Sequence, residues 1–438
     1  MKIGLIGTFD VENFGDCLFP ELYQHLLAQH RPDTEITLYS PRPVCAEILS
    51  FDAVRALPAD LSDTQAFDED ALILIGGETI GVGHSSGTYN FARETLSAFL
   101  RLWTAPVLAQ LDPTARPRFF GAHCVGARKM PAETNKRVAQ VLSGASYCSF
   151  RDAFSAEWIQ TAESRFAQEI DPMFLIDHLC GDHKWATLAQ KHLPQGITPD
   201  GYLVAHMTMG YGGNDLDAWC AAVGALSQET GLPVVLLPIC HFLNDERFLA
   251  AAQSKLSVAG IRTHLIRGKI NVKETAALVG QSAGYIGSSL HGAVTAVAFA
   301  KPLAVLGHSM DGKHEGSLRA VGINGAVTTS PGDLPDCFRR TDAMDHSDAR
   351  QRAQSAARAS FDRLLCALDT APQPSRAVAE QAKAAAAALH QSEMAEVPPG
   401  SAAEIKRLAF RALTRVPALD RPYRAFRMRQ KLGSAIRG

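Results

Sequence analysis

The chain has 438 residues, of which 46% are hydrophobic and 20% charged, and its formal net charge is -2. This composition is typical of a globular protein with two or three domains, and the near-neutral charge argues against nucleic acid as a partner of the whole chain. The 9 cysteines form no C-x-x-C pair, and several lie in apolar runs. That usage indicates a reducing compartment and buried thiols.

The first residues read as a strand and show no signal-peptide pattern, and no apolar run reaches the length of about 18 residues that a transmembrane helix needs. We therefore expect a cytoplasmic protein. Residues 401–438 differ in carrying ten Lys or Arg against two acidic residues. One hypothesis is that this basic amphipathic tail associates the protein with an anionic membrane or an acidic partner; the alternative is a tail exposed to solvent.

In the first half of the chain, short apolar runs alternate with helical patterns. The runs cover residues 3–6, 36–39, 71–75, 118–122 and 147–150, and the first is followed by a helical pattern over residues 18–30. Runs of this kind are typical of parallel strands that are buried on both faces. We predict an N-terminal α/β domain over residues 1–180.

A second series of runs follows a polar stretch at residues 178–200. It covers residues 201–206, 233–238, 262–266, 284–287 and 303–306. We predict a second α/β domain over residues 195–335. Two such halves in tandem place the strand ends of both at a cleft between them.

The pattern becomes helical after about residue 335. We predict that residues 346–370, rich in Ala and Arg, form a helix that packs back on the core. Prolines at 372 and 374 mark a linker, and the remainder, residues 371–438, is predicted to be a helical, partly flexible basic tail.

The most informative turn lies between the run at residues 284–287 and a helix of small residues. It carries Ser288 and Ser289, followed by His291. A helix N-terminus at the carboxyl edge of a parallel sheet suits an anion, so His291 is placed to act on an anionic ligand. The alternative is that His291 only caps the helix, which either serine could also do.

Polar residues also follow two strands of the first half. Asn13 and Asp16 can cap the first helix or hydrogen-bond a hydroxylated ligand. Gly76 and Gly77 let backbone N–H groups face a ligand, and Glu78 adds a carboxylate there. The alternatives are a structural cap and a plain turn with a solvated Glu78.

Arg151 follows another strand, where its guanidinium suits bidentate recognition of phosphate or carboxylate. It could instead pair with Asp152 or with a helix C-terminus.

Three histidines follow strands of the second half: His206, His241 and His291. Each alone is more often structural, but together they are expected to converge on one edge of the sheet. Lys313 and His314 lie in a glycine-rich stretch that we expect to form a loop facing the same cleft.

These motifs, in this order, resemble the polysaccharide pyruvyl transferase family. The similarity covers roughly residues 1–325 and rests on NFGD (13–16), LIGGETI (74–80), FRDAFS (150–155), DPMFL (171–175), LPICHFLNDE (237–246) and SSLHGAVTAVAFAKPLAVL (288–306). The resemblance implies an α/β fold with two Rossmann-like domains in a GT-B-like arrangement, here with a helical C-terminal extension. It also implies phosphoenolpyruvate as donor, a glycan or lipid-linked glycan as acceptor, a ketal as product, and no further cofactor.

The resemblance also assigns roles to residues. His291 would be the catalytic acid and base, with Arg151 holding the donor. The expected substrate-binding residues are Asn13, Asp16, Gly76, Gly77, Glu78, His206, His241, Ser288, Ser289, Lys313 and His314. One departure stands out, because Ser289 occupies the position where the family usually carries an arginine, and Lys313, His206 or His314 are the candidates to replace its charge.

Two other functions remain open from the sequence: a GT-B-like glycosyltransferase that uses a nucleotide sugar, and a glycan-binding member of the family without catalysis. No cluster of ligand residues in the sequence indicates a metal site. The acceptor sugar and the oligomeric state are not fixed by the sequence.

Overall fold

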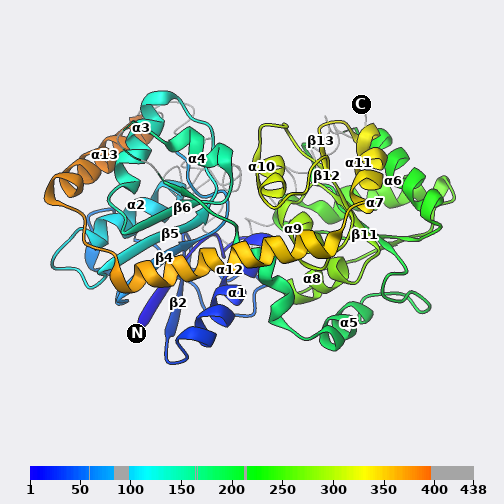
Figure 1. Cartoon of the computed structure of the whole chain (residues 1–438), viewed down its shortest axis with the longest axis horizontal. Coiled ribbons are helices and arrows are strands. Elements are labelled where there is room, and N and C mark those ends of the chain that lie inside the picture. Colours follow the sequence, from blue (N-terminus) through cyan, green and yellow to red (C-terminus); the bar gives the residue numbers. More distant parts are fainter. Residues whose placement is uncertain (59, 83–97, 163, 165, 212–214, 396–438) are drawn as a thin grey trace, which may run out of the picture.

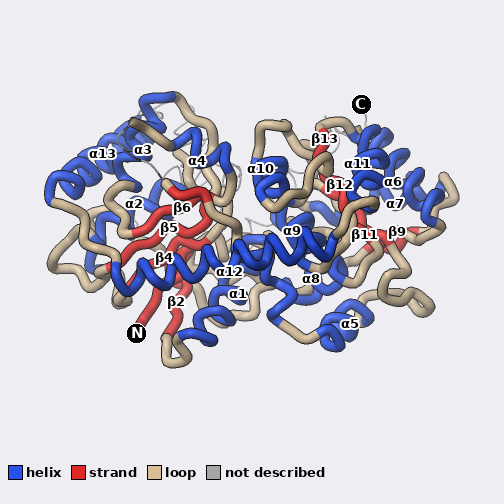
Figure 2. Tube along the Cα trace, viewed as in Figure 1, coloured by secondary structure: helices blue, strands red, loops and turns tan. Residues whose placement is uncertain are grey.

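A computed structural model describes the chain except for residues 59, 83–97, 163, 165, 212–214 and 396–438. Two α/β units lie side by side, and one long helix runs along both of them (Figure 1). Each unit has a parallel sheet covered by helices, as Figure 2 shows by secondary structure. The fold class inferred from the motifs is therefore confirmed.

The first sheet has seven strands in the order β3-β2-β1-β4-β5-β6-β7, all parallel to their neighbours. They are β1 (Lys2–Ile6), β2 (Glu35–Ser40), β3 (Arg55–Ala56), β4 (Ala71–Ile75), β5 (Phe119–Val125), β6 (Tyr147–Phe150) and β7 (Ala167–Gln168). All residues of β4 and β5 are buried, as expected for strands between two helical layers. The edge strands β3 and β7 have only two residues each, which is too short for a hydrophobic pattern to reveal.

The second sheet has six parallel strands in the order β10-β9-β8-β11-β12-β13. They are β8 (Leu203–Ala205), β9 (Val234–Leu236), β10 (Thr263–Leu265), β11 (Gly284–Gly287), β12 (Leu303–Leu306) and β13 (Val327–Thr328). The five predicted runs correspond to β8 to β12, and β13 is again a two-residue edge strand.

The first unit carries α1 (Phe14–His30), α2 (Ala98–Gln110), α3 (Ala132–Leu142), α4 (Ala153–Ile159) and the short 3-10 helix η1 (Thr64–Ala66). The 3-10 helix η4 (Pro172–Leu179) and α5 (Asp182–Gln190) lead to the second unit, so the polar stretch is not a plain linker. The second unit carries α6 (Leu216–Thr230), η6 (His241–Leu243), α7 (Asp245–Val258), α8 (Val272–Gly280), α9 (Leu290–Ala298), α10 (Lys313–Ala320), η7 (Pro331–Asp333) and α11 (Leu334–Asp342).

The C-terminal part of the described chain crosses back to the first unit. Helix α12 (His346–Thr370) buries a stripe of small and apolar residues at helical spacing: Ala349, Ala353, Ala357, Ser360, Phe361 and Leu364. It packs on η4, α9 and β5, and α13 (Arg376–Ala395) then packs on α3 and α2. One hydrophobic cluster is continuous through the two units and α12. In the described part of the chain, no helix combines the length and the apolar character that crossing a membrane would require.

Candidate functional site between the two units

The carboxyl ends of the two sheets meet through the backbone. The loop after β1 pairs with the loop after β9, where Asn13 forms an antiparallel bridge with Cys240, and the N–H of Phe14 donates to the carbonyl of Ile239 at 3.0 Å. Asn13 also caps α1, because its Oδ1 accepts from the N–H of Gly15 at 3.3 Å. Helix α1 therefore begins at Phe14, four residues earlier than its apolar pattern predicts.

His291 reaches from the second unit onto α1 of the first. The glycine at position 15 provides the space for the ring, since a Cβ atom there would lie 1.7 Å from Nδ1 of His291. The ring meets Phe19 edge-on with centroids 5.3 Å apart, and the residue is 8% exposed. Its Nε2 atom has no hydrogen-bond partner among the described residues. An imidazole held this way has Nε2 left for a ligand.

Arg151 follows β6 in the first unit and is 2% exposed. Its Nε and Nη1 atoms have no hydrogen-bond partner in the described part of the chain. Among the described contacts, Asp152 instead caps α4, and both of its oxygens accept from Ser155 at 2.8 Å. A buried guanidinium with unpaired donors calls for an anion from outside the protein.

The charges place Arg151 and His291 in one site. Burial lowers the pKa of His291 well below its usual 6.5, and Arg151, Lys313 and His314 lower it further. His291 is therefore neutral near pH 7 in the free protein. Its neighbours are cations from both units, and they disfavour a further positive charge on the ring.

Two buried carboxyl groups lie near Arg151. Burial raises the pKa of Asp16 to about 6, although Thr8, Arg151, Lys313 and Asn13 all act to lower it. Burial likewise raises the pKa of Asp171 to about 6 against the opposing charge of Arg151. Oδ1 of Asp171 accepts from the N–H of Met173 at 2.9 Å, while Oδ2 has no partner among the described residues.

Glu78 bridges the two units through its charge. Nζ of Lys313, from the second unit, donates to Oε2 of Glu78 at 2.8 Å, and Arg128, from the first unit, pairs with Oε1. Burial raises the pKa of Glu78, but these two cations more than offset it, so that its pKa falls to about 2. Lys313 begins α10, so the predicted loop is the first turn of a helix.

The serines before His291 have backbone roles. The hydroxyl of Ser289 accepts from the N–H of Gly292 at 3.2 Å and so caps α9. The hydroxyl of Ser288 accepts from the N–H of Thr208 at 2.9 Å, and its carbonyl faces Nε2 of His314 at 3.1 Å. The capping expected as an alternative for His291 is thus made by Ser289.

Two of the other predicted histidines, His206 and His314, are held by protein partners. His206 is 1% exposed and its Nε2 lies 2.9 Å from Oδ2 of Asp245, which also accepts from the N–H groups of Ile239 and Cys240. Burial lowers the pKa of His241 on η6. Burial and Lys313 lower the pKa of His314 to about 3. Of the three residues proposed to replace the family's arginine, Lys313 is charged, His314 is kept neutral near pH 7, and His206 is engaged by Asp245.

The turn at Gly76 and Gly77 is packed against the protein, whereas we predicted that its backbone N–H groups face a ligand. Gly76 and Gly77 adopt positive φ angles of 51° and 71°, and a Cβ atom on Gly76 would lie 1.9 Å from the ring of Phe19. The N–H of Gly76 donates to the carbonyl of His123 at 3.1 Å, so it does not face a ligand. The glycines are needed because the chain passes close to α1.

Two residues of the site were missed by sequence reasoning. Arg128 lies three residues after β5, a position that the strand-end argument could have flagged. Asp171 was named only within the DPMFL motif, although its side chain lies near Arg151. Both follow strands of the first sheet, as the predicted residues do.

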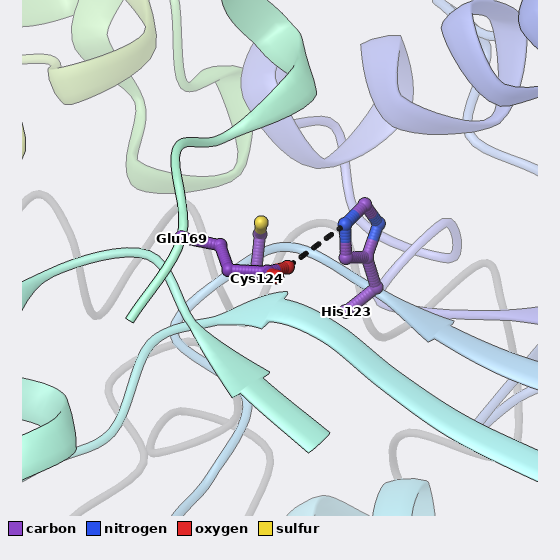
Figure 3. Close-up of side chains that lie close together, drawn as sticks. All are labelled: His123, Cys124 and Glu169. Atoms are coloured by element: carbon purple, nitrogen blue, oxygen red, sulfur yellow. Dashed lines mark ion pairs between the residues drawn. The ribbon is translucent and has the colours of Figure 1, made fainter. Parts of the chain in front are cut away.

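A second polar cluster lies inside the first unit, under α12. His123, Cys124 and Glu169 point toward one another (Figure 3), and their ligand-type atoms lie within 4.8 Å of one another. A bulge in β5 creates this arrangement: the pairing with β6 shifts between Ala122 and Val125, and Cys124 has a φ angle of 51°. The extra residue lets His123 and Cys124 face the same side of the sheet.

Ser360 of α12 sits among these three side chains. Its hydroxyl lies 2.9 Å from Nε2 of His123, 3.2 Å from Sγ of Cys124 and 3.1 Å from Oε2 of Glu169. With a proton on Nε2 of His123, the imidazole and the thiol donate to this oxygen while the hydroxyl donates to Glu169. The Ser360 oxygen thus occupies the position that a metal ion bound by His123, Cys124 and Glu169 would take. We therefore interpret the cluster as a hydrogen-bonded anchor that attaches α12 to the first unit.

Comparisons with known proteins concern the family and the fold of the chain. A model of the family described as polysaccharide pyruvyl transferase matches residues 13–310. No curated protein matches the chain in sequence. Among solved structures, the S. aureus MnaA–UDP complex is 15% identical with a TM-score of 0.51, over 85% of this chain and 99% of that one. The UDP-GlcNAc 2-epimerase from Methanocaldococcus jannaschii is 10% identical with a TM-score of 0.50, over 84% and 99%. At these identities the similarity concerns the two-domain GT-B-like fold alone.

Proposed function

Because the chain belongs to the polysaccharide pyruvyl transferase family, we propose that it transfers the pyruvyl group of phosphoenolpyruvate to a sugar of a surface or exopolysaccharide glycan as a ketal. One observation carries the proposal. Buried Arg151 and His291, from the two units, both keep nitrogen atoms without a partner among the described residues, and they lie among cations that suit a small polyanion.

The reaction needs a proton on the donor's methylene carbon. That protonation turns the adjacent carbon into an oxocarbenium-like centre, and the first sugar hydroxyl attacks it. The bond to the phosphate oxygen then breaks, and the second hydroxyl completes the ketal. The two hydroxyls release two protons. One replaces the proton that was added to the methylene carbon to make the methyl group, and the other leaves with phosphate. The protein must supply an acid, a base and a site for the leaving phosphate.

We assign the proton transfer to His291 and the binding of phosphoenolpyruvate to Arg151. In the free protein burial and neighbouring cations keep His291 neutral. A bound donor with negative charge close to Nε2 opposes both effects and favours the imidazolium, so the acid is charged when the donor is present. Arg151 offers two unpaired donors in the planar arrangement that suits phosphate or carboxylate.

Lys313 is proposed to take over the charge of the arginine that Ser289 replaces. It lies close enough to lower the pKa of His291, and it comes from the same unit. We propose no cofactor beyond the donor, no nucleic acid partner, and a cytoplasmic location near the assembly of lipid-linked glycans. Residues 401–438 are proposed to contact an anionic membrane there; unchanged sedimentation with anionic vesicles after their deletion would remove that proposal.

The direct test is phosphate release from phosphoenolpyruvate by the purified chain. We expect release only when a suitable glycan is added. A thermal-shift experiment distinguishes this function from the alternative, a glycosyltransferase that uses a nucleotide sugar. We expect phosphoenolpyruvate to raise the melting temperature and UDP-sugars to leave it unchanged. Protection by a UDP-sugar alone would favour the alternative, and glycan binding without turnover would favour a non-catalytic family member.

A further inference from the structure

The charged residues of the interdomain site fall into two groups that differ in exposure and in pairing. Arg151 and His291 are 2% and 8% exposed, and each has a nitrogen atom that pairs with none of the residues the structure describes. The side chains of Glu78, Lys313 and Arg128 are 21%, 32% and 33% exposed, and they neutralise one another in part. The inner group suits a small anion, whereas the outer one is open to a larger, uncharged ligand.

The outer group has the hydrogen-bonding capacity for a pair of hydroxyls. A carboxylate has about four lone-pair positions, and Lys313 and Arg128 occupy one on each oxygen of Glu78. The ammonium of Lys313 has three donors, of which Glu78 takes one. Within the described part of the chain, acceptor positions left over on Glu78 therefore lie beside donors left over on Lys313. Hydroxyl groups need such a combination, because each hydroxyl both donates and accepts.

We propose that Glu78 and Lys313 form the acceptor subsite and bind the two sugar hydroxyls that become the ketal oxygens, with Arg128 fixing the Glu78 carboxylate. This assignment rests on the proposed pyruvyl transfer, which requires two neighbouring hydroxyls at the donor carbon. Glu78 binds and orients the sugar hydroxyls. It is not the catalytic base, because its low pKa makes the carboxylate a weak base and a poor proton acceptor. The site then takes a 1,2- or 1,3-diol of a sugar at its outer edge, next to the donor at Arg151.

The test compares Glu78→Gln with the matched control Glu12→Gln. Glu12 pairs with Lys269 across the same two units, so the control removes an interdomain ion pair without touching the site. For Glu78→Gln we expect the KM for the glycan to rise by about 10-fold or more, the loss of one charge-assisted hydrogen bond. The KM for phosphoenolpyruvate should stay within about twofold or fall, since Lys313 and Arg128 lose a competing anion. The control should leave both constants unchanged.

A rise in the KM for phosphoenolpyruvate with an unchanged KM for the glycan would overturn the subsite. An equal effect of Glu12→Gln would also overturn it, because general closure of the units would then be the cause. If the wild type releases no phosphate with any glycan, the proposed reaction fails, and saturation-transfer NMR with methyl galactoside, glucoside and mannoside tests the subsite alone. Binding by the wild type that Glu78→Gln abolishes supports it; equal binding by both, or by neither, rejects it.

Discussion

Two buried polar clusters of this protein contain similar side chains but differ in how these are paired. Under α12, Ser360 hydrogen-bonds His123, Cys124 and Glu169 at once. Between the units, Arg151 and His291 are buried to a similar degree and yet keep nitrogen atoms without partners in the described part of the chain. Burying a polar group without a partner costs free energy, so a protein keeps such groups where a ligand will satisfy them. The pairing, more than the residue types, separates an anchor from a binding site.

The largest effect is expected for His291→Ala. Removing a positioned acid or base typically costs about 10² to 10⁴ in rate, and here kcat should fall by that much. The melting temperature should fall only through the lost packing of the ring against Phe19, because Nε2 bonds to no described residue. Phosphate release and thermal melting are measured on the same preparation. Retained activity would remove His291 from catalysis.

Arg151→Lys tests the donor side of the same site. The charge stays, but the planar pair of donors is lost, so the KM for phosphoenolpyruvate should rise by about 10- to 150-fold, the value of one charge-assisted hydrogen bond. Stability should be nearly unchanged since no described residue bonds Nε or Nη1. A drop in melting temperature with an unaltered KM would instead make Arg151 part of a structural network like that under α12.

Asp16 gives a pH dependence with a definite sign. Burial raises its pKa from 3.8 to about 6, so the folded state holds the proton more tightly than the unfolded state between these values. This group's contribution to stability, about 2–3 kcal/mol, is present below its unfolded pKa and is lost as the pH rises through its folded pKa. Urea unfolding from pH 4 to 7 should show a shallower fall for Asp16→Asn than for the wild type. Parallel profiles would contradict the burial of Asp16.

The smallest effect, and one on stability alone, is expected for Ser360→Ala. The imidazole of His123 would lose its acceptor, whereas the thiol of Cys124 keeps the carbonyl of Ile170 at 3.3 Å. The expected cost is about 1–3 kcal/mol in the free energy of unfolding. Both KM values should stay as in the wild type below the melting transition. Ser355→Ala, on the exposed side of α12, is the control and should change nothing. A kinetic defect without a stability loss would make the cluster under α12 functional.

The sheets and much of the site could be predicted from the sequence. Long strands with both faces buried appear as continuous apolar runs, which is why β4, β5 and β8 to β12 were located. The positions of Arg151 and His291 follow from a general property of parallel sheets, whose strand ends carry ligand-binding residues. The two-residue strands β3, β7 and β13 carry too little pattern to be seen.

What could not be predicted depends on partners far away in the chain. Glu78 is paired with Lys313 across 235 positions, and His206 is held by Asp245. His123 and Cys124 look like ordinary strand residues, and only the bulge and Ser360 of α12 make them a cluster. Sequence reasoning identifies polar residues near a strand end, but the pairing that tells an anchor from a site requires the three-dimensional contacts.

The most direct test is a crystal structure of the protein with phosphoenolpyruvate. We expect anionic oxygens of the donor within hydrogen-bonding distance of the Nε and Nη1 atoms of Arg151 and of Nε2 of His291, with Glu78 still facing Lys313. A donor bound elsewhere, with these nitrogen atoms still unpartnered, would contradict the assignment of the interdomain site to the donor.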